Sequence, residues 1–529
     1  MTEYLGPAAV SGAAVIAGMA LTLGLSWQQA LVGARIGSDH PVHQFIIRNI
    51  RESGYRLFVR IPGLLNTCYC GALPLYLHWI AAHFGAAAAR RGERLLNPIV
   101  NTAHVGVFAL LAWLAARGAP LPPIFVGAAS IAFALTPQFY HALSARNFGL
   151  SARGIGLLLL TVFLLCAFEV EYGTRGAAAW LALIVCGWLV WGFSTFAQQA
   201  LCIVSGLLLL IGRHYAPAVG ALLGLGLFIT LHPRYAPGYL LHTLRFIRTY
   251  RRELAPIYIL AGRHSLWRDL YRDIWLRSRQ GLAAAARYAY GNSLLIVLLL
   301  NPLTLLACWG IARGALPHGD LISYAGDVTV AGMGAMLLTS LRVTRFLGEP
   351  ERYVEAVTPW AVLCGASLLC GRYGAPALLI VSAVFLVLDA AQLYASRLLL
   401  RHLAGQSARL GEVESAVRQS LAGEVRFCSN NEQFTKMLMQ NDWKFAYCLA
   451  VGQDYCGMSL REAFTAFPLL RRSACERIIV TYRVNACLLD RAAFETLFDE
   501  LPRGLRAMSV AYESERFRLL ILDWAGAGV

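Results

Sequence analysis

Two consecutive stretches of the sequence, GAAAWLALIVCGWLVWGFS at residues 176–194 and TFAQQALCIVSGLLLLIG at residues 195–212, contain no charged side chain. A helix needs about 20 mostly apolar residues to cross the roughly 30 Å hydrocarbon layer of a bilayer, and each stretch comes close to that length. A third stretch of the same kind, YAPAVGALLGLGLFITLH, follows at residues 215–232. The three stretches predict three successive membrane-spanning helices joined by very short connections.

Apolar stretches of this kind occupy most of the chain before residue 400. Residues 61–85 form an apolar segment that includes Pro62 and Pro74, and it either spans the membrane or lies at its surface. The first apolar stretch of the chain, residues 7–28, has no basic segment before it and no clear cleavage site, so we expect a retained span and not a signal peptide. The remaining candidate spans are residues 7–28, 97–117, 121–143, 153–171, 291–312, 321–342, 353–371 and 374–396.

The composition agrees with this pattern. Of the 529 residues, 57% are hydrophobic and 14% are charged, and the mean hydropathy is +0.55. Soluble domains carry about 25% charged residues, so much of this chain needs lipid around it. We predict a polytopic α-helical membrane protein with eleven or twelve spans, interfacial helices after the first span and a small α/β soluble domain at the C-terminus.

The composition changes after residue 400, which predicts a transmembrane domain at 1–403 and a soluble domain at 404–529. In the soluble domain, LREAFTAF at 460–467 and RAAFETLFDEL at 491–501 have helical spacing, and RIIVTYRV at 477–484 has the β-branched character of a strand. The mixture predicts a small α/β fold. The pairing of the cysteines in this domain stays open; they are Cys428, Cys448, Cys456, Cys475 and Cys487.

The net charge of +16 comes almost wholly from arginine, since only Lys436 and Lys444 are lysines. The longest basic segment, residues 233–290, holds eleven arginines between apolar stretches. Such charges either flank membrane spans or bind phosphate, whose oxygens match the planar guanidinium. Because the arginines lie in loops between spans, we expect no nucleic-acid partner.

The loop after the first span, residues 29–60, gathers several side chains that carry chemistry. Its centre is GSDHPVHQFIIRNIRESGYR, residues 37–56. Pro41 suits the first turn of a helix, and Gly54 suits the position after its end, so we predict a helix from about His40 to Ser53. Asp39 and His43 then share one face of it.

This helix allows several interpretations. Asp39 or His40 is an ordinary N-cap on an amphipathic interfacial helix, or the carboxylate and imidazoles have a function. A metal site would use Asp39, His40 and His43, and it leaves open a divalent cation as cofactor. Arg48 and Arg51 lie three residues apart on a later turn.

An aspartate in the loop after the first span, followed by interfacial helices and many spans, resembles the type C glycosyltransferases. Asp39 is the residue that matches their catalytic aspartate. Two further segments are similar to the family's sequences: RLFVRIPGLLNTCYCGALPLYLHWIAAHF at 56–84 and TRFLGEPERYVEAVTP at 344–359. In the second, Arg352 and Tyr353 match a family pattern in which Pro359 opens the next span. ERIIVTYRVNACLLDR at 476–491 resembles strand–turn–strand sequences in soluble domains of several such enzymes.

The resemblance implies that a sugar is transferred from a polyprenyl-phosphate-linked donor to an acceptor hydroxyl on a lipid, glycan or protein. Asp39 would be the general base, with help from His40 or His43. A second acid is not evident: Asn101 stands where one would be convenient, Glu169 and Glu171 lie at the far end of their span, and Asp389 is a lone acid inside the last span. The donor phosphate would be bound by arginines and one tyrosine, namely Arg352, Tyr353, Arg146, Arg153, Arg48 and Arg51.

The resemblance also implies a location in the cell inner membrane, with the active site and the C-terminal domain on the extracytoplasmic side. The positive-inside rule opposes this orientation, because most arginine-rich loops fall on the side of Asp39 if residues 61–85 do not span. A transporter or flippase of a lipid-linked or anionic solute is the alternative function, and a non-catalytic scaffold is a third. Transporters place polar groups at mid-membrane, whereas here they gather in loops.

Overall fold

The computed structural model describes the chain except for residues 1–6, 37–39, 58–63, 66–75, 141–148, 174–175, 255, 258–266, 283, 286–287, 289–291, 293–294, 296, 298–299, 342, 348–349, 447–455 and 526–529. The chain divides into two compact units. The helical unit comprises residues 1–35, 90–233 and 263–397, and the mixed unit comprises residues 36–89, 234–262 and 398–529. The predicted boundary near residue 404 stays a prediction.

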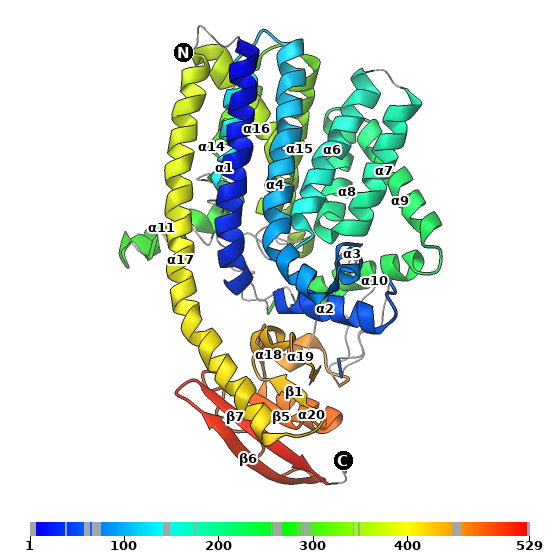
Figure 1. Cartoon of the computed structure of the whole chain (residues 1–529), viewed down its shortest axis with the longest axis vertical. Helices are drawn as coiled ribbons and strands as arrows, with labels where there is room; N and C mark the ends of the chain where they lie inside the picture. Colours follow the sequence, from blue (N-terminus) through cyan, green and yellow to red (C-terminus); the bar gives the residue numbers. More distant parts are fainter. Residues whose placement is uncertain are drawn as a thin grey trace. The chain divides into compact units, whose positions relative to one another are not determined.

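The helical unit is a bundle whose long helices run side by side (Figure 1). Its last helix, α17 (Ala375–Ser420), continues into the mixed unit after residue 397, and the start of α4 (Gly85–Gly118) also belongs to that unit. The elements are α1 (Pro7–Ile36), α4 (Gly85–Gly118), α5 (Phe125–Ala134), η2 (Pro137–Tyr140), α6 (Arg153–Tyr172), α7 (Ala177–Phe193), α8 (Thr195–Ile211), α9 (Ala216–Leu231), α11 (Trp267–Ser278), α14 (Pro302–Ala312), α15 (Asp320–Thr339), η6 (Arg345–Leu347), α16 (Glu351–Tyr373) and α17 (Ala375–Ser420).

These helices confirm the membrane class. Within the described residues, six helices are long and apolar enough to cross a bilayer, in α1, α4, α6, α15, α16 and α17. Shorter apolar helices occupy Phe125–Tyr140, α7, α8, α9 and α14. Each predicted span outside 61–85 overlaps one of these elements, and α14 covers the second half of the span predicted at 291–312.

The described part of segment 61–85 does not span. Its helix α3 (Tyr76–His83) has 8 residues, which is about 12 Å at 1.5 Å per residue. That length is less than half of the hydrocarbon layer. Most of residues 61–75 lie outside the described residues, so an interfacial position for the whole segment stays a prediction.

The centre of the helical unit is α16, whose side chains from Tyr353 to Leu368 are almost all buried. It packs against α14, α15 and α5, whereas α1 and α17 keep large exposed apolar faces. Pro359 lies inside α16 and not at its start, so the expectation that this proline opens the span was wrong. The helix begins eight residues earlier, where Pro350 precedes it and Glu351 occupies its first turn.

The mixed unit begins with α2 (His40–Glu52), which confirms the helix predicted for the first loop. The Gly54 amide donates to Arg51 O at 3.1 Å, and the Tyr55 amide donates to Ile50 O at 2.8 Å. Gly54 has a φ of 74°. These two bonds and the left-handed glycine form a Schellman motif, the ending that the sequence predicted.

The other elements of the mixed unit build the α/β domain and a helix before it. The sheet has five strands, in the order β2 (Lys444–Phe445), β1 (Arg426–Ser429), β5 (Ala486–Asp490), β7 (Phe517–Trp524) and β6 (Leu505–Glu513). Strand β1 is parallel to β2 and β5, and β7 is antiparallel to β5 and β6. The predicted α/β class is therefore confirmed. The elements are α10 (Ala236–Thr249), η4 (Tyr250–Leu254), β1 (Arg426–Ser429), α18 (Glu432–Leu438), β2 (Lys444–Phe445), α19 (Leu460–Ala463), β3 (Phe464–Ala466), β4 (Leu469–Leu470), α20 (Arg472–Tyr482), β5 (Ala486–Asp490), β6 (Leu505–Glu513) and β7 (Phe517–Trp524).

Three local predictions for this domain were wrong in whole or in part. The predicted strand at 477–484 is mostly helix α20, because Cys475, Ile478 and Ile479 are buried at helical spacing against the sheet. The resembling segment at 476–491 is therefore helix–turn–strand. Only the first half of segment 460–467 is helical, and its second half is strand β3.

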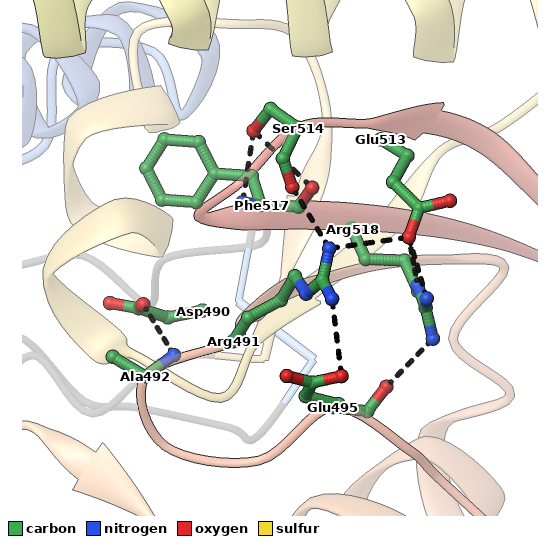
Figure 2. Close-up of polar contacts among 8 residues, drawn as sticks. All are labelled: Asp490, Arg491, Ala492, Glu495, Glu513, Ser514, Phe517 and Arg518. Carbon is green, nitrogen blue, oxygen red and sulfur yellow. Dashed lines mark hydrogen bonds and ion pairs between the residues drawn. The ribbon is translucent and has the colours of Figure 1, made fainter.

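The predicted helix at 491–501 is irregular chain. Asp490 ends β5, and its carboxylate accepts a hydrogen bond from the Ala492 amide at 3.2 Å, a turn that competes with helix formation. Figure 2 shows how this segment is held: Arg491 reaches Glu495, Glu513 and the Ser514 carbonyl, and Arg518 reaches Glu513 and the Glu495 carbonyl. These ion pairs tie the segment to the β6–β7 hairpin.

Candidate functional site

The first feature of the candidate site is a buried ion pair between the start of α6 and the start of α16. Arg153 Nη2 donates to Glu355 Oε2. The two side chains are only 10% and 4% exposed. Charges that are removed from water in this way persist only when they are paired, so the contact fixes the first turn of α6 against α16.

A phenylalanine from α8 joins a second arginine to this pair. The Arg153 Cζ atom lies 5.1 Å from the centroid of the Phe196 ring, and the Arg352 Cζ atom lies 5.6 Å from the same centroid. Both distances are within the range of cation–π attraction. The structure thus brings together two arginines that the sequence predicted as phosphate binders. We call Arg153, Phe196, Arg352 and Glu355 the arginine cluster.

Close packing of backbone positions the arginine cluster. An ideal Cβ at Gly156 would lie 2.5 Å from the Ser194 Cβ, so only glycine lets α6 approach the start of α8 this closely. Ser194 in turn caps α8 by accepting the Ala197 amide at 3.3 Å. This approach places Arg153, three residues before Gly156, beside the Phe196 ring.

Tyr353 supports the cluster from inside the protein. Its side chain is fully buried, its ring centroid lies 5.8 Å from that of Phe196, and its hydroxyl donates to Leu347 O at 2.8 Å. The sequence predicted that Tyr353 binds donor phosphate. Its hydroxyl is engaged with a carbonyl and its ring packs behind Phe196, and its predicted role in phosphate binding stays a prediction.

Sequence reasoning missed Glu355, Phe196 and a second buried acid, Glu93 of α4. Glu93 is 5% exposed. One turn later on the same face of α4, Asn97 Nδ2 donates to Gly149 O at 2.8 Å, four residues before Arg153. Glu93 therefore lies at the end of α4 that adjoins the start of α6. An acid just before an apolar span was the available signal, but it looks like an ordinary membrane-flanking charge.

The residues predicted on the first loop lie in the mixed unit. His43 of α2 and His78 of α3 share a hydrogen bond of 2.8 Å between Nδ1 and Nε2, and their rings stack with centroids 5.0 Å apart. One of these two nitrogens must donate and the other must accept, so the pair can relay a proton. His40 begins α2. His78 was not singled out from the sequence.

Arg48 and Arg51 have protein partners on this unit. Arg48 Nη1 donates to Asn441 O and Asp442 Oδ1, each at 2.6 Å, which joins α2 to the loop after α18. Arg51 Nε donates to Ala82 O at 3.0 Å, which joins α2 to α3. These contacts make both arginines organisers of α2, and their predicted role in phosphate binding stays a prediction.

Asp39 and Arg146 lie outside the described residues, so their predicted roles, and the divalent-cation site with Asp39, stay predictions.

Asn101, the residue that stands in place of a second acid, donates through Nδ2 to Ser26 Oγ at 3.0 Å. Asp389 is fully buried on α17, and within the described part of the chain neither of its carboxyl oxygens has a hydrogen-bond partner.

A different polar cluster occupies the other end of the helical unit. His214, in the connection between α8 and α9, bonds Glu171 Oε2 through Nδ1 at 2.6 Å and Asp327 Oδ2 through Nε2 at 3.0 Å. Two hydrogen bonds raise the pKa of His214 to about 9: the bond to Asp327 has the larger effect and the bond to Glu171 the next. Glu171 lies 18 residues after Arg153 on α6, about 27 Å along the helix, so this cluster is separate from the arginine cluster.

Comparison with known proteins finds solved structures with a similar fold. No family model matches the sequence, and no curated protein matches it. Among solved structures, ArnT from Cupriavidus metallidurans bound to undecaprenyl phosphate is similar with a TM-score of 0.54 and 12% identity, over 96% of this chain and 97% of that chain. The Archaeoglobus fulgidus oligosaccharyltransferase in the apo form is similar with a TM-score of 0.50 and 12% identity, over 90% of this chain and 69% of that chain. The chain therefore shares its fold with these two solved structures.

Proposed function

We propose that this chain, which shares its fold with ArnT and an archaeal oligosaccharyltransferase, is a membrane glycosyltransferase that uses a polyprenyl-phosphate-linked sugar. The observation that carries the proposal is the arginine cluster within that fold. The similarity to ArnT extends over 96% of the chain, and the sequence alone predicts both clustered arginines as phosphate binders. The sugar goes to an acceptor hydroxyl on a lipid, glycan or protein.

In this proposal the arginines stabilise the leaving group. Cleavage of the sugar–phosphate bond releases polyprenyl phosphate, on which negative charge develops. Guanidinium groups aimed at that charge lower the barrier. Phe196 holds both guanidinium groups by cation–π contact without neutralising them, whereas Glu355 orients Arg153 through the ion pair. Arg352 is the principal phosphate ligand, and Arg146, outside the described residues, is a further candidate.

Asp39 is the proposed general base for the acceptor hydroxyl. A positioned carboxylate that accepts the proton contributes about 10²–10⁴-fold in rate. The bonded pair of His43 and His78 offers a route by which that proton can leave, with His40 at the start of the same helix. The location proposed is the cell inner membrane, with the catalytic loop and the C-terminal domain on the extracytoplasmic side.

The test is a transfer assay with the purified full chain in lipid vesicles. Undecaprenyl-phosphate sugars labelled in the sugar are supplied together with a membrane-glycolipid extract, and both the label in the acceptor and the release of undecaprenyl phosphate are measured. We expect the two products to appear in equal amounts. If the labelled lipid crosses the bilayer with its sugar–phosphate bond intact, the chain is a flippase and the proposal fails.

A further inference from the structure

We propose that Cys428, Cys475 and Cys487 form a three-sulfur site for a soft, thiophilic metal ion in the C-terminal α/β domain. Their three Sγ atoms all lie within 4.8 Å of one another. The residues come from β1, α20 and β5, three separate elements of the domain. The inference does not depend on the proposed transferase activity, because none of the three cysteines has a role in the proposed reaction.

The sheet register and one helix bring the sulfurs together. Cys428 of β1 is directly opposite Cys487 of the parallel strand β5, so the two side chains point to the same face of the sheet. Their Sγ atoms are 3.6 Å apart. Helix α20 covers this face, with Ala474, Cys475 and Ile478 buried against it. Cys475 in the first turn of α20 supplies the third sulfur.

The spacing of the sulfurs fits a metal centre. With metal–sulfur bonds of about 2.3 Å, three or four sulfur ligands lie roughly 3.8–4.0 Å from one another. A disulfide would require two of the sulfurs to approach to about 2.05 Å. An ion at the centre therefore needs only small adjustments of side-chain torsions, and it would not require the strands to move.

The donor set and its burial select the class of ion. All three cysteines are 0–1% exposed, and the group of three holds sulfur atoms only. Thiolate ligands without nitrogen or oxygen favour soft ions, and hard ions such as Mg²⁺ and Ca²⁺ need oxygen ligands. A site with three ligands and little room for water favours an ion that accepts low coordination.

Binding also has a proton balance that can be measured. The ligand is the thiolate, so three thiols must lose three protons as one ion enters. A divalent ion then leaves the site with a single negative charge. All divalent ions leave the same charge, so the discrimination comes from the softness of the thiolates, and we expect tighter binding of Cd²⁺ than of Ca²⁺ or Mg²⁺.

The experiment uses the reduced, purified full chain and Cd²⁺ as the probe. We expect one Cd²⁺ per chain, a thiolate-to-cadmium charge-transfer band in the ultraviolet, and release of three protons per ion. Cys428→Ala, Cys475→Ala and Cys487→Ala should each abolish the band while the circular dichroism spectrum is retained. Cys456→Ser is the matched control, because Cys456 is a partly exposed cysteine of the same domain outside the group, and it should bind normally.

Two results would overturn the site. One is a native chain whose mass is lower by two hydrogens because two of the three cysteines form a disulfide. The other is a reduced chain that binds no stoichiometric Cd²⁺, or binds it equally well after the three substitutions are combined. If the variants do not fold, X-ray absorption at the cadmium edge of the unmodified chain decides: a shell of three sulfur atoms supports the site, and nitrogen or oxygen ligands reject it.

Discussion

Arg153 and Glu355 are 202 residues apart in the sequence, yet their side chains form a buried ion pair. The pair joins the first residue of α6 to the second turn of α16. It also holds one of the two guanidinium groups that contact Phe196. The same contact therefore serves both the packing of the bundle and the proposed phosphate site, and substitutions can separate the two roles.

Arg153→Ala is expected to destabilise the protein strongly, because it removes the Arg153 guanidinium from the buried Glu355 carboxylate. Breaking a buried pair in this way costs about 3–5 kcal/mol. The double variant Arg153→Met with Glu355→Leu replaces both charges by apolar groups of similar volume and should recover most of that loss. Thermal unfolding in detergent measures the stability. The double variant should still have impaired sugar transfer, and full transfer by it would contradict a role for Arg153 in catalysis.

Arg352→Ala should raise the KM for the lipid-linked donor. Hydrogen bonds to a charged group contribute about 1.5–3 kcal/mol, which corresponds to roughly 10- to 100-fold. Steady-state kinetics with increasing donor concentration measure the change. Arg372→Ala is the matched control, because Arg372 lies at the other end of the same helix and also contacts an aromatic ring, that of Tyr373. An unchanged donor KM in Arg352→Ala would reject this residue as a phosphate ligand.

Asp39→Asn should lower turnover by about 10²–10⁴-fold, the range for loss of a general base. Asparagine caps a helix as well as aspartate does, so expression and thermal unfolding should stay nearly unchanged. If Asp39 were only an N-cap, the substitution would be almost silent in the transfer assay.

Glu52→Gln is the control for Asp39. Glu52 is the other carboxylate of the loop, its side chain is 57% exposed, and it lies 3.8 Å from Arg48 in the i,i+4 position. An exposed pair of this kind contributes about 0–1 kcal/mol, so this variant should retain activity. A large loss of turnover in Glu52→Gln would move the role of base away from Asp39.

The His214 cluster predicts a loss of stability at alkaline pH. The pKa of His214 rises from 6.5 to about 9 in the folded protein, so folding favours the protonated imidazole. Its contribution is fully present below pH 6.5 and is lost as the pH rises through about 9. We expect a loss of order 1–3 kcal/mol, seen as a falling Tm across this range.

His214→Gln is the variant that tests the assignment. Glutamine keeps a hydrogen-bonding side chain but does not titrate, so the variant should have a lower Tm at neutral pH and should lose this part of the alkaline decline. His318→Gln, which changes another histidine in a connection of the same unit, should keep the pH dependence of the unmodified chain. An identical alkaline decline in His214→Gln would show that another group causes it.

The sequence alone predicted those features of the fold that depend on residues close together in the chain, such as membrane helices and helix ends. The spans at 153–171, 176–194 and 195–212 were predicted within two residues of α6, α7 and α8, because lipid demands an uninterrupted apolar helix of a certain length. The end of α2 was equally predictable, since Gly54 accepts the left-handed conformation that the Schellman motif requires. The fold class followed from these elements together with the resemblance.

The tertiary structure decided which side chains meet. RIIVTYRV has strand propensity, yet most of it lies in helix α20, because packing of Cys475, Ile478 and Ile479 against the sheet outweighs that propensity. Glu355 and Phe196 were not singled out from the sequence, because Glu355 lies at the first residues of the predicted span 353–371 and Phe196 resembles a lipid-facing aromatic. Only the close approach of α6 to α8 at Gly156, and of both to α16, places Arg153, Phe196 and Arg352 together. Contacts between residues so far apart in the chain depend on helix packing, which the periodicity of any single segment does not contain.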